Sequence, residues 1–407
     1  MRCRMRRFFL CALAAFSVAV LPLCASGDNF MEENAEVRIQ NVMAKLRRGE
    51  RVKIAALGGS ITTGYNSNPI NANSWAARTA GWFRSKAAES GCELTFANEG
   101  VSGTDSAFAS VRVGDHIKAI GADMVILEFA MNDQWLDPKV RRRTYEGVIR
   151  QMMNGTDTAV LALFVNERKP PYSGQQYEQQ PICEYYHIPY VSWKDCVFSA
   201  NPNADFDEFF DGEESVHPNN AGHASIASFI TEWLENTWRN LPPDSGIPSP
   251  VRELPVPLTD DGFEFPRYYH RDNISPVSNS GWTAGSPVHT EWVSHGQARQ
   301  GWQSAEAGAE MTFELEGTSV GITYCESDQF RDAQAWVTLP DGTESPKVIL
   351  NCFQANRRGY LGWAYKEIVS GAGPEKYTLH VVVSRRASKS REGKPANITG
   401  IIVTGKK

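Results

Sequence analysis

The sequence has no excess of positive charge. Its 407 residues include 41 Lys and Arg against 47 Asp and Glu, so the formal net charge is −6. Proteins that bind nucleic acid normally carry a basic face or stripe, so this composition argues against a nucleic-acid partner. The hydrophobic fraction of 42% and the charged fraction of 22% are those of a globular protein. They exclude a wholly disordered or fibrous chain.

Cysteine is scarce, and its spacing is not typical of a metal site. Three of the eight cysteines lie within the first 24 residues, and the other five are Cys92, Cys183, Cys196, Cys325 and Cys352. The sequence contains no CxxC pair and no Cys/His cluster with the spacing of zinc ligands. Because five is an odd number, these cysteines cannot all form disulfides within one chain. Proximity in the sequence alone suggests the disulfides Cys183–Cys196 and Cys325–Cys352.

A long apolar run occurs only at the N-terminus. Phe8–Leu23 follows four arginines and has 16 residues, fewer than the roughly 20 of a transmembrane helix. Small residues come next, so residues 1–26 are interpreted as a signal peptide of a secreted or periplasmic protein. Two alternatives remain: a lipid anchor at Cys24, although Leu23 is larger than the residue usual there, and a retained N-terminal anchor. No later stretch is long and apolar enough to span a bilayer.

The remaining chain has two parts with different patterns. Up to residue 240, short apolar strands alternate with helix-like stretches, which predicts parallel βαβ units and a sheet covered on both faces. We therefore expect an α/β domain over residues 27–240. The expected strands are 51–57, 94–97, 123–129, 158–165 and 188–193, and the expected helices are 75–88, 138–153 and 218–238. Four tyrosines surround the polar stretch 173–176, which forms either a rim of the site or an ordinary solvated loop; they are Tyr172, Tyr177, Tyr185 and Tyr186.

A proline-rich segment separates the two parts. Residues 241–257 hold six prolines, which is typical of a stiff, extended linker, here placed at 241–260. Beyond it, short alternating strands and turn residues predict an all-β sandwich or jelly roll over 261–407. This domain either presents aromatic faces to sugar rings, buries those side chains in its core, or packs beside the site as a wall. The tryptophans in question are Trp282, Trp292, Trp302, Trp336 and Trp363.

Three polar motifs follow the first three expected strands. In open α/β sheets this carboxyl edge is where ligands bind. The first strand ends in Gly58-Gly59-Ser60, where the glycines allow a sharp turn and leave the serine hydroxyl exposed. After the second strand, Gly103 would let a backbone N–H face a substrate oxygen. After the third, the Asn132 amide can donate to a developing oxyanion, while Asp133 is expected to hold the loop.

A fourth motif precedes the last expected helix. In Glu214-Ser215-Val216-His217 a carboxylate lies three residues before a histidine. This pair suits general base catalysis, because the carboxylate would orient the imidazole and stabilise its protonated form. Each motif alone also has a structural explanation: Ser60 could cap a helix, and a histidine before Pro218 is more often structural. The order of the four motifs along the chain favours a common site.

In this order the motifs resemble those of the SGNH hydrolases, also called GDSL esterases, across residues 51–238. The resemblance implies a flavodoxin-like three-layer α/β/α fold with a parallel sheet. It also implies Ser60 as nucleophile and His217 as base. The implied oxyanion hole consists of the backbone N–H groups of Ser60 and Gly103 and the side chain of Asn132. Such a site needs no metal or organic cofactor.

Three positions depart from the family pattern. Gly59 stands where many relatives carry Asp, Ala130 where Gly is usual, and Glu214 where the triad Asp normally lies. Because Glu is one methylene longer, Glu214 either reaches the imidazole or leaves a Ser-His dyad. Asp211 and Glu213 are the other candidate acids.

We therefore expect a secreted serine esterase that removes acyl groups, principally acetyl, from a carbohydrate or another small ester. The motifs alone specify only that the substrate is an ester. The expected export and the β domain are the reasons for expecting a carbohydrate ester. One alternative is a lipase, thioesterase or broad carboxylesterase, although no apolar lid-like segment is present. Another is an inactive glycan-binding surface protein, which only the departure at Glu214 supports.

Overall fold

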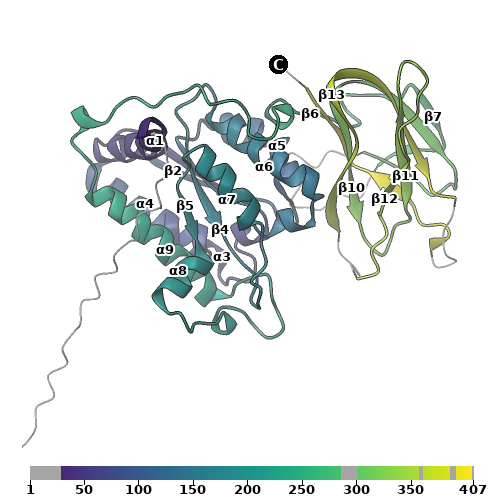
Figure 1. Cartoon of the computed structure of the whole chain (residues 1–407). Helices are drawn as coiled ribbons and strands as arrows, with labels where there is room; N and C mark the ends of the chain where they lie inside the picture. Colours follow the sequence, from purple (N-terminus) through teal and green to yellow (C-terminus); the bar gives the residue numbers. More distant parts are fainter. Residues whose placement is uncertain (1–28, 286–300, 357–360, 386–390, 406–407) are drawn as a thin grey trace, which may run out of the picture.

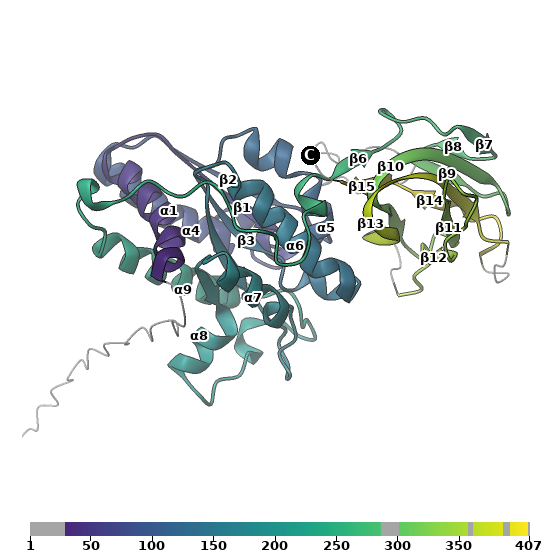
Figure 2. The same cartoon turned by 45° about the horizontal axis from the view of Figure 1, so that its top comes forward.

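The computed structural model describes residues 29–285, 301–356, 361–385 and 391–405. The expected signal peptide lies outside these residues, and so do Cys24 and Trp292. A domain of helices around a sheet is followed by a β-rich domain, and the two lie side by side (Figures 1 and 2). This arrangement confirms the predicted fold class. In the parts of the chain that are described, no helix combines the length and the apolar character needed to cross a membrane.

Five parallel strands form the sheet of the first domain. Their spatial order is β2-β1-β3-β4-β5, the order of flavodoxin-like folds. Side chains of β1 alternate between the two faces: Ile54 packs into one apolar core and Leu57 into the other. The strands are β1 (Val52–Gly58), β2 (Leu94–Gly100), β3 (Met124–Glu128), β4 (Ala159–Phe164) and β5 (Tyr190–Ser192). The five strands were expected from their apolar runs.

Helices cover both faces of this sheet (Figure 2). One face packs against α1 (Asn29–Arg47), α4 (Trp75–Ser90), α8 (Trp193–Ala200) and α9 (Asn220–Arg239). The other packs against α5 (Ser106–Ser110), α6 (Pro138–Met153) and α7 (Gln176–Tyr185). The shorter helical segments are α2 (Ser60–Thr63), α3 (Ile70–Asn73), η1 (Gly114–Lys118), η2 (Asn132–Trp135), η3 (Asp207–Phe209), η4 (Asp244–Gly246) and η5 (Gly262–Glu264).

Helix α7, which begins at Gln176 at the end of the polar stretch, was not expected. Ile182 and Cys183 are buried against the sheet. The hydroxyl of Tyr186 donates a hydrogen bond to the Glu146 carboxylate on α6. The many glutamines of this segment conceal its narrow apolar face, which is why the sequence pattern did not reveal the helix. Of its tyrosines, Tyr177 is the one that is largely exposed.

Neither expected disulfide is present. All five described cysteines are thiols. Cys183 packs on the α6 side of the sheet and Cys196 on the opposite side, so the sheet separates the two sulfur atoms. In the core of the β domain, the Cys352 thiol donates to the backbone carbonyl of Asn397 at 3.5 Å rather than bonding to Cys325.

The β domain consists of two antiparallel sheets. The larger has the order β12-β11-β13-β10-β15-β6, with β7 paired to β10, and the smaller has the order β14-β9-β8. Its longest strands are β10 (Glu310–Glu326) and β13 (Gly362–Val383), which pair along their length. The others are β6 (Arg267–Tyr269), β7 (Ser278–Ser280), β8 (Thr283–Ala284), β9 (Trp302–Ser304), β11 (Ala333–Thr338), β12 (Val348–Leu350), β14 (Ala396–Ile398) and β15 (Gly400–Thr404).

The four described tryptophans considered for sugar binding are buried. Each is at most 8% exposed; they are Trp282, Trp302, Trp336 and Trp363. Trp282, Trp302 and Trp363 belong to the apolar core of the β domain, where large aromatic side chains contribute most. Trp336 instead stacks on the His380 ring, with 4.8 Å between centroids. Of the alternatives left open by the sequence, burial therefore holds for these four tryptophans, and none of them presents an open face to a sugar ring.

The proline-rich segment packs along the first domain. The guanidinium group of Arg38 on α1 donates to the Val251 carbonyl at 2.7 Å. Farther along, Arg150 on α6 donates to the Pro255 carbonyl at 2.7 Å. The carboxylate of Glu146 accepts backbone N–H bonds at the end of the segment. The segment is extended, but it is held in place at several points.

Candidate active site

Ser60 lies at the carboxyl end of β1, as the first residue of α2. Strands β1 and β3 are neighbours at the point where the strand order reverses, which is where ligands bind in such sheets. A Cβ atom on Gly59 would lie 2.3 Å from Oδ1 of Asn132. The Asn132 amide therefore lies against Gly59, and a larger residue at this position would have to displace it.

The His217 imidazole contacts the serine hydroxyl. Nε2 of His217 lies 2.9 Å from Oγ of Ser60. His217 lies in the loop before α9, and the Asn66 side chain donates to its carbonyl at 3.1 Å. The ring of Tyr65 packs against the imidazole with 4.5 Å between ring centroids. Two segments about 150 residues apart in the sequence thus meet at the serine.

Glu214 faces the far side of the imidazole. Its Oε2 lies 3.3 Å from Nδ1 of His217, but Nδ1 makes no aligned hydrogen bond with any described residue. The other carboxylate oxygen, Oε1, accepts the backbone N–H groups of Ser215 and Val216 at 2.9 Å and of His217 at 3.3 Å. Glu214 is therefore fixed by its own turn and makes an electrostatic contact with the imidazole.

The pKa of the Glu214 carboxyl lies below its ordinary value. Partial burial raises this pKa, but the N–H bond from Val216 and the charge of the facing His217 lower it by more. The carboxylate is therefore ionised at neutral pH. Of the two other candidate acids, Asp211 accepts a hydrogen bond from Asn219 at 3.0 Å and Glu213 is exposed.

The Gly103 loop and the Asn132 turn flank Ser60. Gly103 has a φ of 72°, in the left-handed region that favours glycine. Beside it, the Ser102 hydroxyl lies 3.2 Å from the Thr63 hydroxyl, so the loop lies against α2. On the other side, Asn132 begins η2, the next element after β3. The structure thus brings the expected donor segments to the same end of the sheet as the serine.

Asp133 connects the Asn132 turn to α5. The buried carboxylate accepts the Ser106 backbone N–H at 2.8 Å and the Gln179 side chain at 2.8 Å. Burial raises the pKa of Asp133 well above its ordinary value, and the nearby charge of Asp105 adds to this shift. Asp133 holds the loop, as expected from the sequence.

Two exposed aromatic residues beside the site were not expected. Tyr65, which packs on His217, is 54% exposed, and Trp135 is 75% exposed. Trp135 ends the 3₁₀ turn that begins at Asn132. A 3₁₀ helix rises about 2 Å per residue, so the two Cα atoms lie roughly 6 Å apart. The sequence does show an aromatic residue three positions after the motif, but not its exposure.

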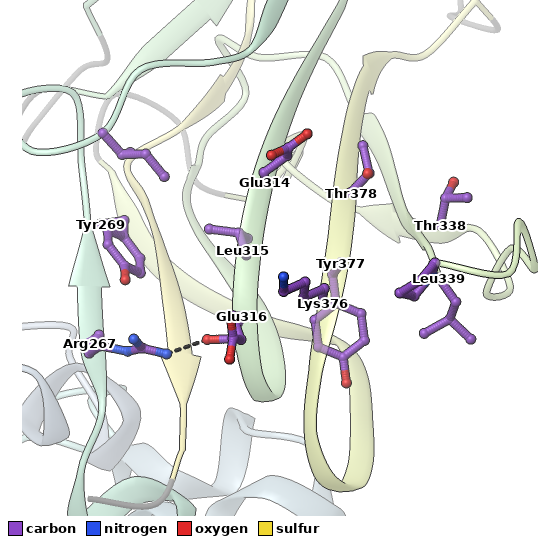
Figure 3. Close-up of a pocket in the computed structure, with 12 residues that line it drawn as sticks. Arg267, Tyr269, Glu314, Leu315, Glu316, Thr338, Leu339, Lys376, Tyr377 and Thr378 are labelled. Carbon is purple, nitrogen blue, oxygen red and sulfur yellow. Dashed lines mark hydrogen bonds between the residues drawn. The ribbon is translucent and has the colours of Figure 1, made fainter.

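The β domain contains a separate groove of about 460 Å³ (Figure 3). Its lining combines both signs of charge, and the Arg267 guanidinium donates to the Glu316 carbonyl across one side. The lining comes from β6, β10, β13 and the residues around the end of β11: Arg267, Tyr269, Ile274, Glu314, Leu315, Glu316, Thr338, Leu339, Pro340, Lys376, Tyr377 and Thr378. None of the expected site residues lines this groove.

Comparison with known proteins identifies the class of the first domain. Residues 56–225 match the GDSL-like Lipase/Acylhydrolase family. No curated protein sequence matches the chain. Two crystal structures of a two-domain esterase (CEX) active on acetylated mannans match with TM-scores of 0.77 and 0.75, the second co-crystallized with mannopentaose. Both are 23% identical to this chain and cover 92% of it and 96% of their own length.

A further structural match covers about half of the chain. The Axe2 acetylxylan esterase from Geobacillus stearothermophilus is 16% identical, covers 47% of this chain and 98% of its own, and has a TM-score of 0.39. Because the sequence identity to the two-domain esterase is only 23%, this similarity shows a shared fold. The chain thus carries a GDSL-like hydrolase domain followed by a β-rich domain, in the two-domain fold of that esterase.

Proposed function

We propose that this protein is a serine esterase that removes acyl groups, principally acetyl, from a carbohydrate. The observation that carries the proposal is the 2.9 Å contact between Ser60 Oγ and His217 Nε2, with the Asn132 amide packed against Gly59. A nucleophile within hydrogen-bonding distance of its base, beside an amide donor, is the arrangement that acyl transfer requires.

The reaction proceeds through an acyl-enzyme. Oγ of Ser60 attacks the ester carbonyl carbon while Nε2 of His217 takes the hydroxyl proton. The Asn132 amide and the backbone N–H groups of Ser60 and Gly103 donate to the oxyanion that forms. As the intermediate collapses, the imidazolium gives its proton to the leaving sugar oxygen. Water, deprotonated by His217, then releases the acid and restores Ser60, while Glu214 stabilises the protonated imidazole.

Two observations support a carbohydrate as the substrate. Tyr65 and Trp135 are exposed, one against His217 and the other at the end of the Asn132 turn. Aromatic faces of this kind pack against the apolar faces of sugar rings. The two-domain esterase of the same fold is active on acetylated mannans. Export through the N-terminal segment belongs to the same proposal, since acetylated polysaccharides lie outside the cell.

Hydrolysis of p-nitrophenyl acetate, butyrate and octanoate by the mature protein and by Ser60→Ala tests the chemistry. We expect the acetate ester to be cleaved fastest and the variant to be inactive. Unchanged hydrolysis by Ser60→Ala would refute the serine mechanism. Preference for octanoate would refute the proposal that the acyl group is acetyl. A failure to release acetate from any acetylated polysaccharide would refute the proposal that the substrate is a carbohydrate.

Trp135→Ala tests the carbohydrate contact separately from the chemistry. We expect KM for an acetylated mannan to rise about tenfold, the value of one aromatic contact, while kcat for p-nitrophenyl acetate stays unchanged. Trp135→Phe, which keeps a flat ring, should recover most of the affinity. An equal effect of Trp135→Ala on both substrates would contradict a role in glycan binding.

A further inference from the structure

The apolar core of the β domain continues into the first domain behind the Gly103 loop. Val101, two residues before Gly103, and Phe108 on α5 are fully buried in the same apolar cluster as the core of the β sandwich. The ring of Phe108 packs edge-on against Trp363 of β13, with 4.3 Å between centroids. The candidate oxyanion loop is therefore supported by a side chain of the other domain.

A second apolar cluster lies behind the Asn132 turn. Leu136, the residue directly after η2, is 5% exposed and packs in one cluster with Tyr365 and Ile402 of the β domain. Ala107 of α5 belongs to the same cluster. Both segments that carry candidate oxyanion donors thus have β-domain side chains packed against them.

Hydrogen bonds join these two segments to each other. The Asp133 carboxylate, next to Asn132, accepts the N–H of Ser106 at the start of α5. Asp105 caps the same helix by accepting the Phe108 N–H at 3.1 Å. A displacement of α5 is therefore transmitted to the Gly103 loop on one side and to the Asn132 turn on the other.

Ion pairs fix the two domains against each other at this interface. Arg143 on α6 pairs with Glu367 of β13 at 2.6 Å and also with Asp260 of the connecting segment. Its guanidinium lies over the ring of Phe263, 5.3 Å from the centroid. Arg143 and Glu367 are largely buried, with side chains 14% and 16% exposed.

We propose that the β domain is a structural part of the oxyanion hole. Trp363, Tyr365 and Ile402 hold the Gly103 loop and the Asn132 turn where their donors meet the transition state, and are positioning residues. The inference rests on the proposed serine chemistry but not on the acyl group or the glycan. Oxyanion donors act only when they are precisely placed, and a misplacement of about 1 Å can cost about 100-fold in rate.

The test measures the rate at which a fluorophosphonate labels Ser60. Oγ attacks phosphorus, fluoride leaves, the serine proton passes to His217, and the phosphoryl oxygen occupies the oxyanion hole. We expect Tyr365→Ala and Ile402→Ala to lower this rate and kcat for p-nitrophenyl acetate by about 10- to 100-fold. KM should change little. Ile402→Ala removes fewer atoms and serves if Tyr365→Ala does not fold.

Two control variants separate position from general destabilisation. Phe313→Ala empties a similar space in the β core, against Trp302, but lies far along the β10–β13 pair from Trp363. Tyr365→Phe removes only a hydroxyl that has no hydrogen-bond partner among the described residues. Both should label at the wild-type rate at a temperature where circular dichroism shows them folded.

Three outcomes overturn the inference. Interface variants that melt at a lower temperature but label at the wild-type rate would make the β domain a neighbour without influence on the site. A decrease of the same size in Phe313→Ala would assign the effect to general loss of stability. If the fluorophosphonate does not label Ser60 of the wild-type protein, the serine mechanism itself is refuted. By contrast, a wild type that labels rapidly but releases no acetate from glycans would refute only the proposed substrate.

Discussion

Gly59 determines where the Asn132 amide can lie. Because a Cβ atom at this position would come within 2.3 Å of Oδ1 of Asn132, Gly59→Ala must turn the amide away from Ser60. We expect kcat for p-nitrophenyl acetate to fall by about 100-fold, the effect of losing one oxyanion donor, with KM nearly unchanged. Steady-state kinetics on the two proteins provide the measurement.

Gly81→Ala is the matched control for this substitution. Gly81 is an exposed residue of α4, and a Cβ atom there meets nothing within 4 Å. This change should leave kcat unaltered and stabilise the helix by about 0.5–1 kcal/mol. Equal activities of Gly59→Ala and Gly81→Ala would contradict the role assigned to the Asn132 amide.

In the proposed mechanism Glu214 acts through its charge, because its carboxylate faces Nδ1 of His217 at 3.3 Å without an aligned hydrogen bond. Glu214→Gln keeps an oxygen for the backbone N–H groups but removes the charge. We expect kcat to fall by about 10- to 100-fold, less than the loss of the aspartate costs a well-aligned triad. A kcat equal to that of the wild-type protein would indicate a Ser-His dyad that does not depend on Glu214.

At the scale of elements, His223 connects α9 to the loop that carries Tyr65. In its buried ring, Nδ1 accepts the Trp75 backbone N–H at 3.2 Å and Nε2 donates to the Tyr65 carbonyl at 3.1 Å. Burial lowers the pKa of His223 to about 4. The neutral ring thus holds the backbone of the residue that packs on His217.

The lowered pKa predicts a loss of stability in acid. In the unfolded chain His223 takes up a proton near pH 6.5, whereas in the folded protein it does so only near pH 4. The free energy of unfolding should therefore fall as the pH decreases from 6.5 towards 4, by about 2 kcal/mol between pH 7 and pH 4.5. Urea unfolding at both pH values should show a smaller decrease for His223→Gln. Equal decreases in the two proteins would refute this assignment.

The sequence predicted the elements whose apolar pattern is strong. All five parallel strands were visible as apolar runs, and α4, α6 and α9 as amphipathic stretches. The pattern did not reveal α1, nor α7, which carries many glutamines. In the β domain, where short strands were expected, β10 and β13 are long because register shifts between Gly317 and Gly321 let their pairing continue.

The site was predictable only as far as its residues lie in motifs. Ser60, Gly103, Asn132 and His217 follow strands or precede a helix in a recognisable order. The exposed ring of Trp135 depends on what packs around it, which no local pattern encodes. The same limit explains the wrong disulfides and the buried tryptophans, since proximity in the sequence does not show which face of a sheet a side chain takes.

At the scale of the molecule, the two domains differ from a pair joined by a flexible tether. Domains within a chain move relative to each other unless their interface is large and apolar. Here the connecting segment is hydrogen-bonded to α1 and α6. Residues of both domains share two apolar clusters, and Arg143 pairs with Glu367 across the boundary. Separating the domains would expose apolar side chains and break the ion pair between Arg143 and Glu367.

This arrangement predicts that the protein unfolds as one unit. Removing one partner of a buried ion pair is strongly destabilising, and here the pair also holds two apolar surfaces together. Calorimetry of the mature protein should therefore give one transition, with a calorimetric enthalpy close to the van 't Hoff enthalpy. Glu367→Ala, which leaves the Arg143 charge partly buried, should lower the transition temperature and broaden or divide the peak. Two separate transitions in the wild-type protein would show that the domains are energetically independent.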